Sequence, residues 1–236
     1  MPKRTSLPDW EAVLSAAARL QGMLPEAVLV GGTAAAIHAR HRFSRDAYHV
    51  LPGLRGRFDD ILAQLESVAG WRTARVQRPV QILGSLDGVE TGIRQLIRDQ
   101  PLQTTVVRYG SHAITVPTKE EILRIKSALI LKRNATRDYL DFVALADQLG
   151  DESTAKALSI LDRLYPQPND ESALQQLQIQ LANPLPYDLE QTRLAEYKLL
   201  APRGHDWKVV QDACSHWATV IFDRVAAMKQ KRRRSH

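Results

Sequence analysis

Apolar and polar positions near the start of the chain predict a strand, a helix and a second strand. Residues 27–30 form a continuous apolar run, which is typical of a short strand buried on both faces. Small side chains over residues 32–41 predict a helix packed close behind that strand. Residues 46–51 predict the second strand, which ends at Pro52 and Gly53. An opening helix is expected over residues 8–22.

Residues 57–116 contain both helical and strand patterns of hydrophobic positions. Phe58, Ile61, Leu62, Leu65 and Val68 recur at helical spacing, so residues 57–69 predict an amphipathic helix. A short helix is also expected over residues 90–97, and Gly84 and Gly88 are interpreted as turns. Further strands are expected at residues 71–76, 80–83, 104–107 and 113–116.

From residue 118 onward the pattern is almost wholly helical. Prolines separate the helical segments, at positions 166, 168, 184, 186 and 202. The predicted fold class is therefore α+β. We expect a mixed-sheet domain over residues 1–117 and a helical domain over residues 118–236.

Composition narrows the setting of the protein. The 236 residues are 44% hydrophobic and 25% charged, which is ordinary for a globular chain. No apolar run approaches the roughly 20 residues of a membrane helix, so no membrane association is expected. Cys214 is the single cysteine, which excludes an internal disulfide and favours a cytoplasmic location. We expect Cys214 to act as a small buried hydrophobe.

The formal net charge of +6 is concentrated at one end. Residues 229–234 carry five positive charges and no acid. Such a tail can attract phosphate backbones without sequence specificity, or it can be a frayed, solubilising end.

The candidate chemistry begins at a glycine pair. Gly31 and Gly32 follow the first strand, where they let the backbone approach a phosphate. Asp46 opens the second strand and can hold Mg²⁺ beside that phosphate. This arrangement suits transfer of a nucleotide from a nucleoside triphosphate, in which carboxylate-bound magnesium neutralises the reacting phosphoryl group.

Residue 48 departs from that pattern. Two acids at positions i and i+2 of a strand point to the same face, but Tyr48 takes the second position here. A neutral phenol is a poor magnesium ligand. His49 points to the opposite face, so it does not replace the missing acid.

A second group of charges lies in residues 122–141. If this segment is one helix, Lys126, Arg133 and Arg137 share a face that suits a triphosphate. The alternative is a solvated basic face with an ion pair between Arg137 and Asp141. A helix break at Asn134 would change this argument.

Together these motifs resemble the AbiEii-like nucleotidyltransferase toxins of bacterial toxin–antitoxin and phage-defence systems. The resemblance covers roughly residues 25–150. It rests on Gly-Gly-Thr-Ala at 31–34, Ser-Arg-Asp at 44–46, Lys126, and Arg-Asp-Tyr-Leu-Asp at 137–141. It implies transfer of a nucleotide from a triphosphate to RNA, in some members to the 3′ end of tRNA, and a cognate antitoxin as partner.

The resemblance also implies roles for individual residues. The catalytic group would comprise Asp46, Tyr48, Lys126, Asp138 and Asp141, with Asp46 on Mg²⁺ and Asp138 or Asp141 as the distal acid or base. By the resemblance, the triphosphate would be bound by Gly31, Gly32, Thr33 and Lys126. The residue pattern adds Ser44, Arg133 and Arg137 as candidate ligands.

Three explanations of Tyr48 stay open at the level of sequence. Tyr48 is an inactivating change, or the chain is a degenerate member that binds nucleotide or RNA without chemistry, or the enzyme uses one metal ion with Asp46 and a distal acid. The leading function is therefore an impaired RNA nucleotidyltransferase, and the alternative is a binding module for a nucleotide, RNA or protein partner.

Overall fold

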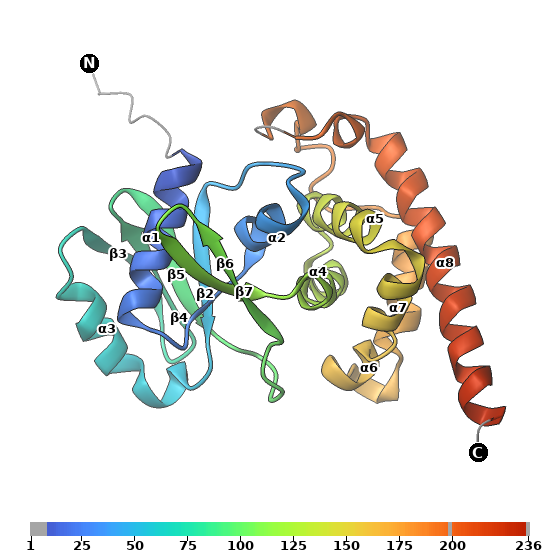
Figure 1. The fold of residues 1–236 in the computed structure, drawn as a ribbon, viewed down its shortest axis with the longest axis horizontal. Helices are drawn as coiled ribbons and strands as arrows, with labels where there is room; N and C mark the ends of the chain where they lie inside the picture. Colours follow the sequence, from blue (N-terminus) through green and yellow to red (C-terminus); the bar gives the residue numbers. More distant parts are fainter. Residues whose placement is uncertain (1–8, 198–199, 235–236) are drawn as a thin grey trace. The chain divides into compact units, whose positions relative to one another are not determined.

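The protein folds into two units (Figure 1). The computed structural model describes residues 9–197 and 200–234, without the side chains of Glu196 and of residues 228–234. The first unit contains Met1–Ala34 and Phe43–Thr118, and the second contains Ala35–Arg42 and Lys119–His236. The sequence placed the boundary between residues 117 and 118 and did not separate residues 35–42.

The first unit is built on a five-stranded mixed sheet, and the expected α+β class is confirmed. The strands lie in the order β1 (Val28–Leu29), β2 (Asp46–Leu51), β5 (Val89–Gln95), β4 (Gln81–Leu86) and β3 (Trp71–Gln77). Strands β2 and β5 are parallel, and the other neighbours are antiparallel. Strands β6 (Thr104–Tyr109) and β7 (His112–Pro117) form a separate hairpin.

The helices of the first unit cover one side of this sheet. Helix α1 (Trp10–Met23), which Asp9 caps, contacts β2, β5 and β7. A 3₁₀ turn, η1 (Leu54–Arg57), leads into α3 (Phe58–Glu66). The core between them is apolar, with Leu20, Leu51, Leu65, Ile82, Leu86 and Ile93 all fully buried. Helix α2 (Gly31–Ala39) begins in this unit and ends among residues assigned to the second.

The two faces of the sheet differ sharply because strand residues alternate in direction. The covered face carries buried side chains such as Ala47, His49 and Ile93. The opposite side, which we call the open face, has no buried side chain; its one buried residue is Gly92. The open face consists of positions 46, 48 and 50 of β2, 90, 92 and 94 of β5, 81, 83 and 85 of β4, and 72, 75 and 77 of β3.

The second unit is helical. Its helices are α4 (Lys119–Arg133), α5 (Thr136–Leu158), α6 (Leu161–Leu164), α7 (Ala173–Ala182) and α8 (Trp207–Arg234). Short 3₁₀ turns occur at η2 (Pro168–Asp170), η3 (Leu194–Glu196) and η4 (Pro202–His205). Helix α5 packs against α4 and α8, and α7 packs against α4 and α8. Cys214 is buried on α8, and burial raises the pKa of its thiol to about 12.

Two local predictions are wrong. Residues 90–97 were expected to be a helix, but Val89–Gln95 is strand β5, whose amides pair with β2 on one side and β4 on the other. Gly84 lies inside β4 rather than in a turn. The helix break at Asn134, which the sequence left open, is present: Asn134 adopts a φ of 46° and separates α4 from α5, so residues 122–141 are not one helix.

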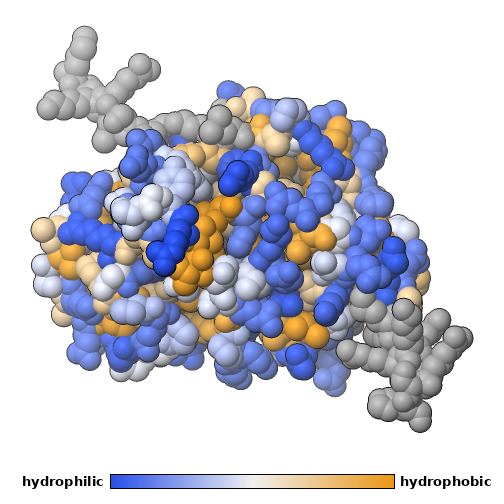
Figure 2. All heavy atoms as spheres, in the orientation of Figure 1, coloured by the Kyte–Doolittle hydropathy of each residue, from blue (hydrophilic) through white to orange (hydrophobic). Residues whose placement is uncertain are grey.

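Polar and hydrophobic side chains are intermixed over the surface in Figure 2. Among the described helices, none combines the length and the apolar character that a membrane crossing requires.

His49 is a buried titratable residue whose effect on stability depends on pH. It is fully buried on β2, and this burial lowers the pKa of its imidazole to about 3. Below pH 6.5 the unfolded chain binds a proton at this histidine, whereas the folded chain does not until about pH 3. The free energy of unfolding should therefore fall by about 1.4 kcal/mol per pH unit over this range from His49 alone.

The variant His49→Leu should lack this component. We expect urea unfolding at pH 7, 6 and 5 to show a smaller loss of stability with acid in His49→Leu than in the unchanged protein. His216→Gln, at an exposed position of α8, is the control and should keep the original slope. Identical pH slopes in His49→Leu and the unchanged protein would contradict the assignment.

Candidate functional site

The glycine turn is fixed against β2 by two hydrogen bonds. Gly31 has a φ of +77°, a left-handed conformation that glycine adopts without strain and that turns the chain from β1 into α2. Just before it, the Val30 N–H donates to the Tyr48 carbonyl oxygen at 2.8 Å. Just after it, the Thr33 hydroxyl donates to the Asp46 carbonyl oxygen. The start of α2 is therefore held beside the first residues of β2.

This helix start has the properties of an anion site. The first backbone N–H groups of a helix lack intrahelical partners and carry the positive end of the helix dipole. Helix α2 begins at Gly31, and its first turn contains no acidic residue. Gly31, Gly32 and Thr33 thus form this end of the helix, and such ends favour phosphate.

Asp46 has an acidic neighbour that the sequence did not reveal. Asp46 on β2 lies directly opposite Glu90 on β5, and both side chains are on the open face. The Ser44 hydroxyl donates to Asp46 Oδ1 at 2.9 Å, which orients that carboxylate. The sequence missed Glu90 because residues 90–97 were interpreted as a helix, and pairing between distant strands is not visible in local spacing.

Tyr48 interacts with this second acid. Its hydroxyl donates a hydrogen bond to Glu90 Oε1, and the Arg94 guanidinium lies 5.7 Å from the centre of its ring. Burial and then the bond to Glu90 raise the pKa of the phenol, so Tyr48 is neutral at physiological pH. Tyr48 therefore caps one oxygen of Glu90 with a proton donor.

The donor set fits one magnesium ion better than two. Magnesium is commonly held by one or two carboxylates, with the remaining positions taken by water and substrate phosphates. Asp46 and Glu90 supply two neighbouring carboxylates, although Tyr48 engages one of them. Within the described residues no group of three or more His, Cys, Asp or Glu side chains could hold a metal by itself.

The predicted residues of the second unit form a buried ionic cluster. The Lys126 ammonium lies 2.5 Å from Asp141 Oδ2 and 3.2 Å from Asp138 Oδ1, and all three side chains are fully buried. Arg133 donates to both oxygens of Asp138, at 2.5 and 2.8 Å. The break at Asn134 allows this contact, because it directs the chain back so that α5 begins beside the end of α4.

His41 and Arg42 complete this cluster, although the sequence did not indicate that they contact Asp141. Arg42 donates to both oxygens of Asp141, at 2.7 and 3.0 Å, and His41 Nε2 lies 2.7 Å from Asp141 Oδ1. Burial alone would raise the pKa of Asp141, but Arg42 and Lys126 hold it well below its usual range. An ionised carboxylate with these partners accepts a proton poorly, which favours a positioning role for Asp141 over that of a base.

Arg137 lies apart from these contacts. It is exposed at the start of α5, and within the described residues it forms no ion pair with Asp141. The two groups of predicted residues thus belong to different units. Gly31, Gly32, Thr33, Ser44, Asp46 and Tyr48 lie in the first, and Lys126, Arg133, Arg137, Asp138 and Asp141 lie in the second. The side chains of the basic tail, residues 229–234, fall outside the described residues.

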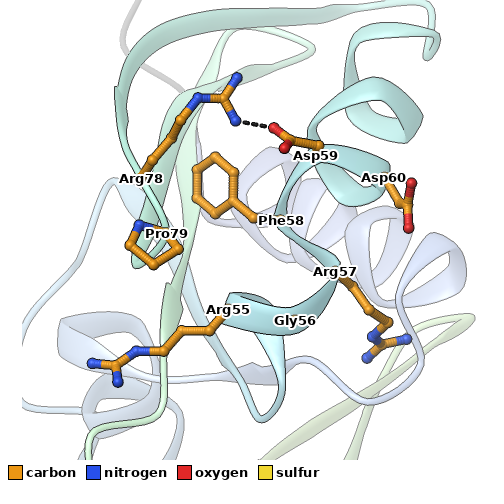
Figure 3. A pocket seen from close by; sticks show the side chains of 8 residues that line it. All are labelled: Arg55, Gly56, Arg57, Phe58, Asp59, Asp60, Arg78 and Pro79. Atoms are coloured by element: carbon orange, nitrogen blue, oxygen red, sulfur yellow. Dashed lines mark hydrogen bonds and ion pairs between the residues drawn. The ribbon is translucent and has the colours of Figure 1, made fainter.

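A surface hollow of about 470 Å³ in the first unit contains none of these residues. Figure 3 shows that Arg78 reaches Asp59 across Phe58, whereas Arg55 and Arg57 point in different directions. The Arg78 guanidinium lies 5.2 Å from the Phe58 ring centre. Two of the charged residues that line the hollow, Arg78 and Asp59, are paired with each other. We therefore prefer the glycine turn over this hollow as the candidate site.

Comparison with known proteins supports the fold. A crystal structure from H. pylori, described as a "putative nucleotidyltransferase", matches with a TM-score of 0.54 and 14% identity, over 91% of this chain and 94% of that one. The chain therefore has the fold of nucleotidyltransferase-like proteins. No protein-family model matches it.

Curated relatives match only in part. The mycolic acid-containing lipids exporter MmpL11 of Mycolicibacterium smegmatis is 30% identical over 129 residues, which is 53% of this chain and 13% of that protein. The heme uptake protein MmpL11 of Mycobacterium tuberculosis is 38% identical over 95 residues, 39% of this chain and 10% of that protein. The chain spans little more than a tenth of these relatives, so no transport role is carried over to it.

The buried cluster predicts a large stability effect at Asp141. Replacing Asp141 with Asn leaves Arg42 and Lys126 buried with one fewer negative charge, so we expect a loss of about 3–5 kcal/mol in the free energy of unfolding. Urea unfolding at neutral pH measures this loss. Asp223→Asn makes the same chemical change at an exposed position of α8 and should alter stability by about 0.5 kcal/mol or less. Equal stabilities of the two variants would argue against a structural role for the cluster.

Proposed function

We propose that this protein is a magnesium-dependent nucleotidyltransferase that acts from a nucleoside triphosphate onto an RNA acceptor. The observation that carries the proposal is the glycine turn at the start of α2, which two hydrogen bonds hold beside Asp46. An anion site and a carboxylate pair lie next to each other there, as nucleotidyl transfer requires. The fold shared with nucleotidyltransferase-like proteins supports the same conclusion.

The residues of the first unit divide the work. The first N–H groups of α2, at Gly31, Gly32 and Thr33, bind the triphosphate oxygens. Asp46, oriented by Ser44, and Glu90 hold Mg²⁺, which neutralises charge on the α-phosphate when bound. The acceptor hydroxyl oxygen forms a bond to the α-phosphorus, pyrophosphate leaves, and the hydroxyl proton passes to water.

The finer assignment rests on the motif resemblance. We assign the acceptor as RNA, most specifically the tRNA 3′ end, and the role as that of a toxin opposed by a cognate antitoxin. The Lys126 ammonium is fully buried and paired with Asp138 and Asp141, so its proposed role is to position those two acids rather than to contact a phosphate. Arg133 and Arg137 are proposed as further phosphate ligands.

One observation favours the alternative of a non-catalytic binding module. Tyr48 stands where a second acid is expected, and its hydroxyl engages Glu90. In that case the anion site of α2 binds a nucleotide without transferring it. The two functions differ in whether nucleotide transfer appears once Tyr48 no longer engages Glu90.

The substitution Tyr48→Asp tests this difference. It supplies a carboxylate beside Asp46 and releases Glu90, so we expect incorporation of α-labelled nucleotide into total tRNA to rise by about 100-fold or more, since carboxylate-held metal is worth several kcal/mol in such reactions. Each of four nucleoside triphosphates is tested with Mg²⁺ present. The preferred one identifies the donor.

Asp46→Asn in the Tyr48→Asp background is the matched control and should abolish the gain. Absence of transfer by Tyr48→Asp, with the protein folded and the triphosphate bound, would instead support the binding module.

Tyr48→Phe separates the phenol hydroxyl from the ring. Removing the hydroxyl frees Glu90 Oε1, and hydrogen bonds to charged groups contribute about 1.5–3 kcal/mol. We therefore expect magnesium affinity, measured by calorimetry with a non-hydrolysable triphosphate, to increase by about tenfold or more. Glu90→Gln should remove the increase. An unchanged affinity in Tyr48→Phe would exclude Glu90 as a metal ligand.

A further inference from the structure

The open face of the first unit carries its charges in a definite order. Strand register places Asp46, Glu90, Ser85 and Arg72 on one rung across the sheet. The next rung holds Tyr48, Gly92, Leu83 and Arg75, and the third holds Val50, Arg94, Gln81 and Gln77. The acids thus lie on β2 and β5, and arginines lie beside and beyond them.

These arginines are available for a ligand. Arg72, Arg75 and Arg94 are exposed, and within the described residues none of them forms an ion pair. Some exposed arginines of the same unit are paired, as Arg19 is with Asp87 and Arg57 with Glu26, whereas Arg55 and Arg108 form no ion pair within the described residues and are not on this face. The open face therefore presents positive charge that its own acids do not neutralise.

A glycine, which has no side chain, lies at the centre of the open face. Gly92 lies between Tyr48 and Leu83, and a Cβ there would be 2.6 Å from the Ile82 carbonyl oxygen. A strand spacing of about 4.8 Å places β3 roughly 14 Å from β2. That span is longer than a single phosphate group and suits an extended chain.

We infer that the open face is the track for the acceptor RNA strand, whose phosphates contact Arg72, Arg75 and Arg94 and whose 3′ end lies at Asp46 and Glu90. The inference deepens the proposed function and rests on it for the identity of the ligand. Arg72 and Arg75 lie on an edge strand, where charge also discourages aggregation. Arg94 lies on the inner strand β5, where that explanation does not apply, yet it shares the same face.

The test compares two double variants of equal charge. Arg72→Gln/Arg75→Gln removes two open-face arginines. Arg55→Gln/Arg108→Gln removes two exposed arginines of the same unit, from η1 and β6. The probe is a fluorescein-labelled 12-nucleotide single-stranded RNA, and its affinity is measured by anisotropy over a series of salt concentrations.

The open-face variant should bind the RNA about tenfold more weakly, and the slope of log K against log salt should shrink by about 1.4, or 0.7 for each lost contact. The control should change affinity by about twofold or less. Equal weakening in both variants, or no weakening in either, overturns the inference.

A second measurement distinguishes failure of this inference from failure of the proposed function. Binding of a fluorescent ATP analogue with Mg²⁺ should be the same in both double variants and in the unchanged protein. If neither the unchanged protein nor the variants bind the analogue, the proposed function is wrong. The comparison of RNA affinities still shows whether RNA binds the open face. In the Tyr48→Asp background, the open-face change should raise KM for RNA while kcat stays within about twofold.

Discussion

The double pairing of strand β2 is the constraint on which the candidate site depends. β2 is hydrogen-bonded to β1 on one side and to β5 on the other. Because side chains alternate, a slip of one residue would bury Asp46 and expose His49. The buried positions Ala47, His49 and Leu51 resist that slip, since they fill the core beneath α1. The core therefore determines which residues reach the open face.

The buried charges of the second unit impose a different constraint. Placing Lys126, Asp138 and Asp141 out of water is costly unless every charge is paired. The observed contacts meet this condition, because Asp141 alone accepts from His41, Arg42 and Lys126. Segment 35–42 is thereby tied to α5 through its charged end. Residues that look like phosphate ligands in the sequence thus also determine the architecture of their own unit.

Sequence patterns predicted the elements whose structure depends mainly on interactions between residues close in the sequence. Strand β2 was predicted with its observed bounds, and the glycine turn was found because a short apolar strand precedes it. Strand β5 was missed because its stability comes from partners on both sides rather than from its own sequence. For the same reason the sequence did not show that Glu90 lies beside Asp46, or that Arg42 pairs with Asp141, which is 99 residues away. Asn134 carried a usable signal, since asparagine tolerates a positive φ.

Tyr48 is best understood through the charges that surround it. Asp46 and Glu90 are neighbouring carboxylates, and a third acid at position 48 would increase their repulsion whenever no metal is bound. The phenol instead donates a hydrogen bond to Glu90, and Ser44 donates one to Asp46. Arg94 adds a positive charge over the Tyr48 ring. The carboxylates are therefore stabilised without a metal, and a metal ion must compete with the Tyr48 hydroxyl for Glu90. This competition connects the single departure from the acidic motif to the activity of the site.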